Sequence, residues 1–323
     1  MKKIVFNGFR HGHINGLYGA VKNSPEMEII GCYESDAEAR EKASKQLKAD
    51  ISGEGYAEML KNADIVAIGG RYGERGAAII EALKNGKHVI ADKPICTSLS
   101  EFEEIKKLST ENNLSVIIML DLRYIASTQI AKPILDSGEL GEVRNVSFTG
   151  QHCLDYGKRP MWYFEEGMHG GTVNDIAIHG IDLVRYLTGM NISKNDAVRT
   201  WNSYAKEEPH FKDCATFMAR LENGAGVMAD VSYSSPSAAL PIPSYWEFRF
   251  WCEHGMLEFN YATPVVKVYK KGEGEVRNVS GDANGTTWLT DLLSEIESGD
   301  RSITEDMLES TKQTLILQAE AKE

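Results

Sequence analysis

Residues 82–94 have the sequence ALKNGKHVIADKP, which joins the end of a helix to a strand. The helical spacing of apolar residues over 76–85 stops at Gly86, and glycine is common directly after a helix. The short apolar run His88–Ala91 then predicts a buried strand. Lys93 follows that strand. At this end of a strand in an open α/β sheet, side chains face the crevice in which ligands bind.

The alternation of helix and strand extends over the first 120 residues. Apolar runs predict strands at 4–6, 27–33, 64–68, 88–91 and 116–120, and helical spacing predicts helices at 14–21, 36–47, 76–85 and 100–112. Ser100 and Glu103 have the spacing of a capping box at the start of the last helix. This alternation predicts a parallel sheet with helical crossovers. The expected fold class is therefore α/β, with a doubly wound N-terminal domain.

The pattern changes after residue 121. Strands are predicted at 143–149, 215–221, 226–233, 245–251, 256–259 and 265–269, and helices at 128–136, 173–187, 288–297 and 305–321. The prolines and serines of 234–244 predict a surface loop. We therefore expect two domains, 1–121 and 122–323, the second α+β with a large, mostly antiparallel sheet. Helices on one side of this sheet would leave a face that a second subunit covers, through alternating residues of 215–221 and 227–233.

The composition excludes several function classes. The chain has 323 residues and a formal net charge of −12, which argues against binding to nucleic acid or to an anionic membrane surface. No apolar run approaches the roughly 18 residues that a membrane span needs. The N-terminal residues predict a strand and not a signal peptide. The five cysteines are scattered and show no C-x-x-C spacing, which favours a reducing cytoplasm.

The loop after the first strand matches part of a dinucleotide fingerprint. That fingerprint, G-x-G-x-x-G, places a pyrophosphate at the N-terminus of the next helix. Gly8 is in register, whereas Arg10 and His13 stand at the second and third glycine positions. Two interpretations follow. The loop is either a polar surface turn, or it binds a diphosphate through the side chains of Arg10 and His11.

Glu34 ends the second predicted strand, 26 residues after Gly8. An acid at this position accepts hydrogen bonds from both ribose hydroxyls of a dinucleotide and repels a 2′-phosphate. It therefore predicts NAD, with NADP disfavoured. The alternative is an ordinary surface glutamate.

A second candidate site lies in the segment 170–182, GGTVNDIAIHGID. Asp175 and His179 are four residues apart and would share one face of a helix. A carboxylate beside an imidazole fixes its tautomer and raises its basicity, which suits a general acid/base. The alternative is that His179 only packs beside an exposed acid. The spacing of Asp175, His179 and Asp182 also fits a metal, but Lys93 would add a cation there, so no metal is predicted.

Five segments, in order, resemble motifs of the Gfo/Idh/MocA family, the relatives of glucose–fructose oxidoreductase and inositol dehydrogenase. They are A-L-x-x-G-K-H-V at 82–89, the lysine of E-K-P at 92–94, R-[FY] at 123–124, G-x-[IL]-G-x-[VI] at 138–143 and G-G-x-x-x-D-x-x-x-H-x-x-D at 170–182. The resemblance covers nearly the whole chain. It implies a Rossmann domain, an NAD(P)-dependent oxidation or reduction of a sugar or polyol, and a homodimer or homotetramer built through the C-terminal sheet.

The resemblance also implies roles for single residues. Lys93 would bind and polarise the reacting oxygen, His179 would accept or donate the proton, and Asp175 would orient His179. The expected cofactor contacts are Gly8, Phe9, Arg10, His11, Glu34, Gly69, Gly70, Arg71 and Asp92, and the expected substrate contacts are Arg123, Tyr124, His152 and Trp162.

Three departures from the family pattern bear on these roles. The glycine loop is degraded, Asp92 replaces the commoner glutamate, and Gly69-Gly70-Arg71-Tyr72 replaces a common T-P-x-x-x-H segment. Two alternatives therefore stay open. One is a glycosidase of the same family that uses bound NAD for a transient oxidation, and the other is a non-catalytic relative that binds a dinucleotide or ligand.

Overall fold

The computed structural model describes residues 1–238 and 241–323, and it divides into two compact units. The first unit comprises residues 1–119, 167–170 and 287–309, and the second comprises 120–166, 171–286 and 310–323. A single cut between 121 and 122 is therefore too simple, since two later segments return to the first unit. Of the predicted loop 234–244, residues 239 and 240 lie outside the described residues.

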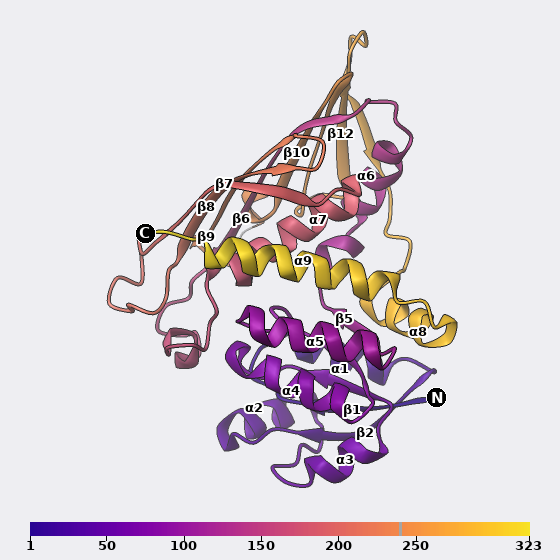
Figure 1. Cartoon of the computed structure of the whole chain (residues 1–323), viewed down its shortest axis with the longest axis vertical. Helices are drawn as coiled ribbons and strands as arrows, with labels where there is room; N and C mark the ends of the chain where they lie inside the picture. The colour runs from indigo at the N-terminus through magenta and orange to yellow at the C-terminus, as the bar shows by residue number, and fades with distance from the viewer. Residues whose placement is uncertain (239–240) are drawn as a thin grey trace. The chain divides into compact units, whose positions relative to one another are not determined.

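The first unit contains a five-stranded parallel sheet in the order β2-β1-β3-β4-β5. Figure 1 labels β1, β2 and β5 of this sheet. Its strands are β1 (Lys2–Asn7), β2 (Met27–Tyr33), β3 (Ile65–Ile68), β4 (His88–Ala91) and β5 (Val116–Ile118). Ser52 forms a parallel bridge with Tyr33 at the outer edge of β2. The strand order reverses between β1 and β3, as it does in the doubly wound sheets that bind dinucleotides.

Helices connect these strands as the alternation predicts. They are α1 (His13–Lys22), α2 (Ala37–Leu47), α3 (Tyr56–Asn62), α4 (Tyr72–Lys84) and α5 (Leu99–Glu111). The short α3 has no counterpart among the predicted helices. The cap of α5 also differs from the prediction: Ser98, and not Ser100, accepts from the backbone N–H of Glu101. The chain offers the S-x-x-E spacing twice, and the earlier serine is used.

The segment 287–309 belongs to the first unit because it packs against β5. It contains α8 (Trp288–Ser298) and the first part of α9 (Ser302–Ala319). The backbone N–H of Val116 donates to Thr304 Oγ1 at 3.0 Å, and Arg301 donates to the carbonyl oxygen of Leu114 at 3.2 Å. The strand edge thus receives its polar partners from residues nearly 190 positions later in the chain.

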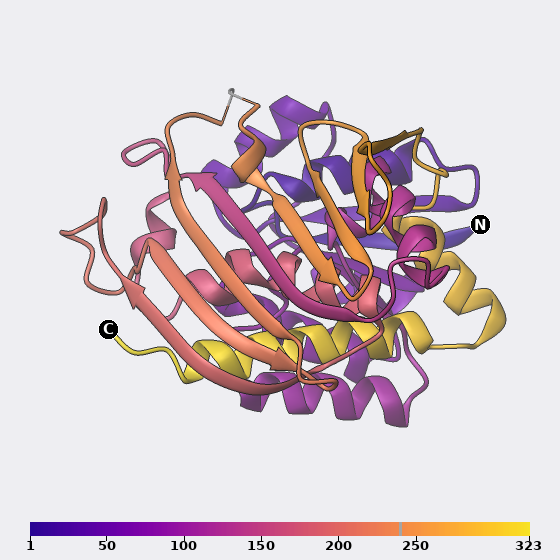
Figure 2. The same cartoon turned by 90° about the horizontal axis from the view of Figure 1, so that it is seen from above.

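The second unit contains an eight-stranded sheet in the order β13-β12-β11-β10-β6-β9-β8-β7, in which only β6 and β9 pair in parallel (Figure 2). Its strands are β6 (Val143–Cys153), β7 (Ile192–Trp201), β8 (Cys214–Leu221), β9 (Gly226–Ser235), β10 (Glu247–Cys252), β11 (Gly255–Asn260), β12 (Val265–Lys270) and β13 (Arg277–Ser280). Its helices are α6 (Ala126–Asp136) and α7 (Ile178–Thr188), with a π-helical turn η3 (Val173–Ala177) and short 3₁₀ turns η1 (Asp121–Tyr124), η2 (Met161–Phe164) and η4 (Pro243–Tyr245).

One face of this sheet packs against α7. A Cβ on Gly180 of α7 would lie 2.2 Å from the ring of Phe148, so the helix can approach β6 only through glycine. Because side chains alternate along a strand, the residues on this covered face include Phe217 of β8 and Tyr233 of β9, both buried. The opposite face carries Met218 and Met228, each about half exposed.

The alternation of buried and exposed residues along β8 and β9 corrects one expectation about the open face of the sheet. The apolar residues of 215–221 and 227–233, namely Ala215, Phe217, Ala219, Leu221, Val227, Ala229, Val231 and Tyr233, are buried within this unit. They form its core and cannot cover a partner. The residues that alternate with them, such as Met218 and Met228, lie on the open face and could contact a second subunit.

Candidate functional site

The first unit has a pocket of about 300 Å³ at the carboxyl ends of β1 and β3. Ligands bind at this end of open α/β sheets, where the strand order reverses. Its lining residues include a buried acid, flanking acids and three arginines: Gly8, Arg10, Glu34, Asp36, Gly70, Arg71, Glu74 and Arg75. Five of the predicted cofactor contacts, Gly8, Arg10, Glu34, Gly70 and Arg71, are thus brought together.

Gly8 allows the backbone to form a narrow part of this pocket. It has a φ of +91°, a region that favours glycine, and a Cβ there would lie 2.5 Å from the backbone nitrogen of Gly70. Gly69 is equally constrained, because its Cβ would lie 2.7 Å from the carbonyl oxygen of Gly8. The loops after β1 and β3 therefore meet backbone to backbone, which leaves room beside them.

Glu34 is held at the end of β2 by main-chain donors. The backbone N–H of Phe9 donates to its Oε2 at 2.7 Å, and that of Asp36 donates to its Oε1 at 2.9 Å. Only 2% of the residue is exposed, although it lines the pocket. Arg10 lies 3.1 Å from Asp36, with a longer contact of 3.9 Å to Glu34. The interpretation of Glu34 as an ordinary surface residue is therefore wrong.

A buried ionic cluster surrounds Asp92 after β4. The carboxylate of Asp92 lies 2.8 Å from Arg75, 2.5 Å from Nδ1 of His11 and 3.1 Å from Nδ1 of His13. Burial alone would raise the pKa of Asp92, but the charge of Arg75, followed by the charges of His11 and His13, holds it well below its usual range. Burial dominates for His11 and lowers its pKa to about 4. At neutral pH the cluster therefore holds an ionised carboxylate and a neutral His11.

Tyr72 links this cluster to Lys93. Its ring lies 4.4 Å from the guanidinium of Arg75, 6.0 Å from the ammonium of Lys93 and 5.5 Å from the ring of His11. The ring of His169 lies 5.8 Å away on another side. No sequence motif assigns a role to Tyr72 or Arg75. The only signal was the unusual segment 69–72, which ends at Tyr72.

The second candidate site begins with a π-helical turn where an α-helix was predicted. Asp175 lies in η3, and His179 lies in the first turn of α7. The hydroxyl of Tyr233, on β9, donates to Oδ2 of Asp175. Burial, followed by the charge of Asp175, raises the pKa of Tyr233 well above its ordinary value, so this hydroxyl keeps its proton. Single-turn π-helices within α-helices are frequent at functional sites.

Aromatic rings surround His179 and one predicted substrate contact. The ring of His179 lies 5.6 Å from that of Trp246, and the ring of His152 lies 5.5 Å from the same indole. His152 also lies 6.5 Å from Tyr233 and 4.8 Å from Tyr245. The structure thus gathers His152, His179 and, through Tyr233, Asp175 on the covered face of the sheet. Tyr233 and Trp246 are the residues that sequence reasoning missed, since nothing in the sequence places β9 beside η3.

The other predicted substrate contacts have protein partners. Arg123, expected to face substrate, forms a buried ion pair with Asp182, where its Nε lies 2.7 Å from Oδ2. Trp162 is 3% exposed, and its ring lies 4.1 Å from that of Tyr163. Tyr124 is half-buried in η1. These partners account for Arg123 and Trp162 in structural terms, and their contact with substrate stays a prediction.

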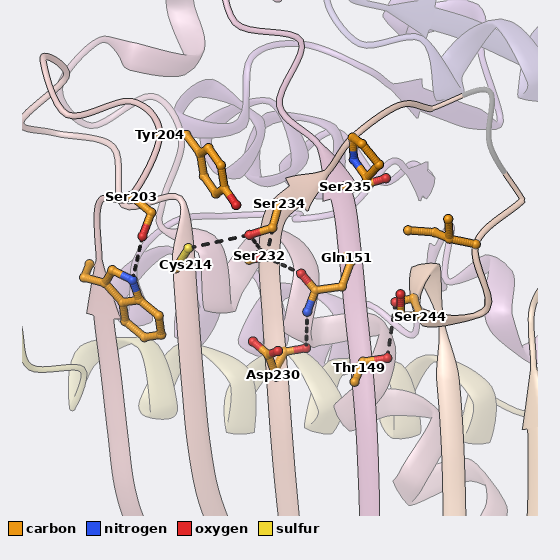
Figure 3. A pocket seen from close by; sticks show the side chains of 13 residues that line it. Thr149, Gln151, Ser203, Tyr204, Cys214, Asp230, Ser232, Ser234, Ser235 and Ser244 are labelled. Atoms are coloured by element: carbon orange, nitrogen blue, oxygen red, sulfur yellow. Dashed lines mark hydrogen bonds between the residues drawn. The ribbon is translucent and has the colours of Figure 1, made fainter.

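The open face of the same sheet has a separate hollow of about 550 Å³ (Figure 3). Its lining is rich in hydroxyl groups and includes Thr149, Gln151, Asp230, Ser232 and Ser234. The amide of Gln151 donates to the carbonyl oxygen of Asp230 at 3.2 Å. Because Gln151 and Ser232 alternate with residues of the covered face, this hollow lies on the opposite side of the sheet from Asp175 and Tyr233.

Comparison with protein-family models identifies the class. Residues 3–120 match the oxidoreductase family with an NAD-binding Rossmann fold, and residues 128–258 match the GFO/IDH/MocA C-terminal domain. The chain belongs to the Gfo/Idh/MocA family, as the motifs predicted, and its N-terminal unit is the NAD-binding Rossmann fold of that family.

Curated relatives of this chain include named dehydrogenases. The chain is 28% identical over 152 residues to levoglucosan dehydrogenase of Pseudarthrobacter phenanthrenivorans, a match that covers 46% of this chain and 38% of the relative. It is 28% identical over 162 residues to scyllo-inositol 2-dehydrogenase (NAD⁺) of Bacillus subtilis, covering 50% of this chain and 46% of the relative. These matches span less than half the length of either relative.

Solved structures extend the similarity in fold to the whole chain. A levoglucosan dehydrogenase in complex with NADH and levoglucosan superposes with a TM-score of 0.78 and 19% sequence identity, covering 98% of this chain and 95% of that one. At this identity the match establishes the fold and no more. None of the helices within residues 1–238 and 241–323 has the length and apolar character needed to cross a membrane.

Proposed function

We propose that this protein is an NAD-dependent dehydrogenase or reductase that acts on a hydroxyl or carbonyl group of a sugar or polyol. The observation that carries the proposal is the pocket at the ends of β1 and β3, where Glu34 is buried at the end of β2. The names of the curated relatives support the substrate class.

The residues of the pocket fit a dinucleotide. A side chain at Gly8 or Gly69 would fill the narrow region between the two loops, so the glycines preserve the space that a diphosphate requires. Arg10 and Arg71 line the pocket and offer guanidinium donors in place of the missing fingerprint glycines. Glu34 offers a carboxylate to the ribose hydroxyls, which favours NAD over NADP. Phe9, His11 and Asp92 belong to the same proposed cofactor site.

The proposed chemistry divides among three side chains. Bound nicotinamide supplies a hydride acceptor or donor at its C4 carbon. For oxidation, His179 takes the hydroxyl proton of the substrate, while the ammonium of Lys93 binds the same oxygen and stabilises its alkoxide-like form. Asp175 fixes the orientation of His179 and stabilises the imidazolium that forms. For reduction, His179 returns the proton to the carbonyl oxygen.

The test is spectrophotometric. The full chain is mixed with NAD⁺ and a panel of sugars, anhydrosugars and inositols, and NADH formation is followed by absorbance. At least one member of the panel should give turnover, at a higher rate with NAD⁺ than with NADP⁺. Tight dinucleotide binding without net NADH formation, together with release of sugar from glycosides, would instead identify the glycosidase alternative. Dinucleotide binding without any turnover would identify the binding protein.

We also propose that the protein forms a homodimer or homotetramer through the open face of the eight-stranded sheet. Met218, Met228 and Trp251 are each about half exposed and lie on the strands of that sheet. Sedimentation should give a mass of at least twice the 35.8 kDa of one chain. Met228→Glu should lower that mass, whereas Met161→Glu, at an exposed methionine outside the sheet, should leave it unchanged. A mass of one chain at micromolar concentration would contradict the proposal.

We also propose that the protein works in a reducing cytoplasm, because its five cysteines are scattered along the sequence and show no C-x-x-C spacing.

A further inference from the structure

The cluster at the end of β4 places three metal-binding atoms close together. One ring nitrogen of His11, one of His13 and a carboxylate oxygen of Asp92 all lie within 4.8 Å of one another. Two of these contacts are already short, at 2.5 Å from His11 to Oδ2 and 3.1 Å from His13 to Oδ1. Ligands around one tetrahedral metal ion lie roughly 3.3 Å apart, given bonds of about 2.0–2.1 Å. Small movements of the two imidazoles would therefore suffice to coordinate an ion.

We propose that His11, His13 and Asp92 form a binding site for a divalent transition-metal ion of the zinc, cobalt or nickel class. Two imidazole nitrogens and one carboxylate oxygen are a donor set that these ions prefer, whereas Mg²⁺ and Ca²⁺ prefer oxygen ligands alone. The half-exposed side chain of His13, 42% accessible, leaves a path from solvent to the site. The metal site could not be predicted from the sequence, because Asp92 lies about 80 residues after the two histidines.

The neighbouring groups determine how tightly such an ion binds. The guanidinium of Arg75 donates to Oδ2 of Asp92 at 2.8 Å and to the carbonyl oxygen of Lys93, which fixes the carboxylate. Outer partners of this kind orient a ligand and raise the affinity of a site. The positive charge of Arg75 acts in the opposite direction, since it repels the cation. We therefore expect affinity in the micromolar range, well below that of a structural zinc site.

The position of the site predicts a regulatory effect, and this consequence rests on the proposed function. His11 and Asp92 belong to the proposed cofactor site. An ion bound to these residues would lie at the loop that follows β1. Zinc and NAD⁺ should therefore compete, so that zinc inhibits the enzyme reversibly and a chelator restores its activity.

The experiment titrates ZnCl₂ into the full chain, with any affinity tag removed, by isothermal calorimetry. One zinc ion per chain should bind, and MgCl₂ should give no binding heat. His13→Ala, at a half-exposed position that leaves the Asp92–Arg75 pair intact, should weaken zinc binding at least about tenfold, as expected for the loss of one of three ligands. The matched control His210→Ala, at an exposed histidine of the second unit, should bind zinc like the parent chain.

Two further measurements separate the outcomes. Co²⁺ should give a visible absorption band that His11→Ala and His13→Ala both abolish, while circular dichroism shows that the variants fold. Absence of zinc binding, or equal binding by His13→Ala and His210→Ala, would overturn the metal site and leave the proposed function untouched. Zinc binding that saturating NAD⁺ does not weaken would overturn the competition, and failure of NAD⁺ to bind at all would overturn the proposed function instead.

Discussion

Polar residues are brought together in different ways in the parallel sheet and in the eight-stranded sheet. In the parallel sheet, every strand ends at the same edge, so Gly8, Glu34, Gly70 and Asp92 come together because each follows a strand. In the eight-stranded sheet, the covered face and the open face draw alternate residues from the same strands. Tyr233 contacts Asp175, while its neighbour Ser232 lines the hollow on the other side. Strand order therefore locates the first site, and only side-chain alternation locates the second.

The largest expected effects fall on two residues, His179 on the covered face of the eight-stranded sheet and Lys93 after β4. His179→Ala should retain NAD⁺ binding and lose about 10²–10⁴-fold in turnover, because general acid–base catalysis contributes that much. Lys93→Ala, at the edge of the parallel sheet, should lose at least as much and should also weaken substrate binding. Asp175→Asn should lose less, since the imidazole remains. Steady-state kinetics on the substrate found above measures each change. Turnover at the parent rate in both His179→Ala and Lys93→Ala would show that the assigned residues are wrong.

A smaller effect is expected from a pair of variants on the two faces of the eight-stranded sheet. Tyr233→Phe removes the hydroxyl that donates to Asp175 and should lower turnover by about 10- to 150-fold, because a hydrogen bond to a charged group contributes about 1.5–3 kcal/mol. The pH–rate limb assigned to His179 should shift with it. Tyr204→Phe, beside the hollow on the open face, is the matched control and should leave both unchanged. Equal kinetics in the two variants would show that the hydroxyl of Tyr233 does not contribute to catalysis.

Glu34, at the carboxyl end of β2 in the parallel sheet, should determine the choice between NAD⁺ and NADP⁺. Glu34→Ser removes a negative charge beside the proposed ribose position, and the preference for NAD⁺ over NADP⁺ should narrow about fivefold, as expected for roughly 1 kcal/mol of like-charge repulsion. Glu34→Gln keeps an acceptor for the N–H of Phe9 and should narrow the preference to a similar extent. Dissociation constants for the two cofactors provide the measurement, with the exposed Glu38→Ser as control. Equal or better binding of NADP⁺ by the parent chain would contradict this role for Glu34.

The smallest effect concerns stability. The pKa of His11 is lowered from 6.5 to about 4, so between these values the unfolded chain binds a proton that the folded chain does not. Stability should therefore fall as the pH is lowered through this window, with a contribution from His11 on the order of 1 kcal/mol. Urea midpoints at pH 7 and pH 5 should differ less in His11→Asn than in the parent chain or in the control His254→Asn. An unchanged pH dependence in His11→Asn would contradict the burial of a neutral imidazole.

The sequence predicted the strands of the first sheet because the relevant signals are local, and it placed the candidate site residues at their ends. Each strand is an apolar run, and Glu34 and Lys93 are recognisable by their place directly after a strand. The roles of Tyr72 and Arg75 could not be predicted, since they depend on how the first turn of α4 faces the end of β4. The short α3 was missed, since seven residues give little periodicity.

Six of the eight strands of the second sheet were predicted, all but β7 and β13, and the two faces of the sheet were not distinguished. The apolar residues of β8 and β9 suggested an exposed interface, yet they form the core beneath α7. Whether an apolar face is covered depends on where the helices pack, which the strands themselves do not encode. For the same reason the partner of Asp175 came from β9, and not from the helix that the sequence pattern described.

The π-helical turn Val173–Ala177 makes the second site sensitive to chain length as well as to residue type. A π turn contains one residue more than the α-helical turn that it replaces, so a single deletion would allow the segment to relax into a continuous α-helix. Each residue of an α-helix advances by about 100°, from 3.6 residues per turn. Such a deletion, placed between Asp175 and His179, would change the angle between the two side chains about the helix axis without changing either residue. The length of this segment is therefore as informative as the identity of its residues.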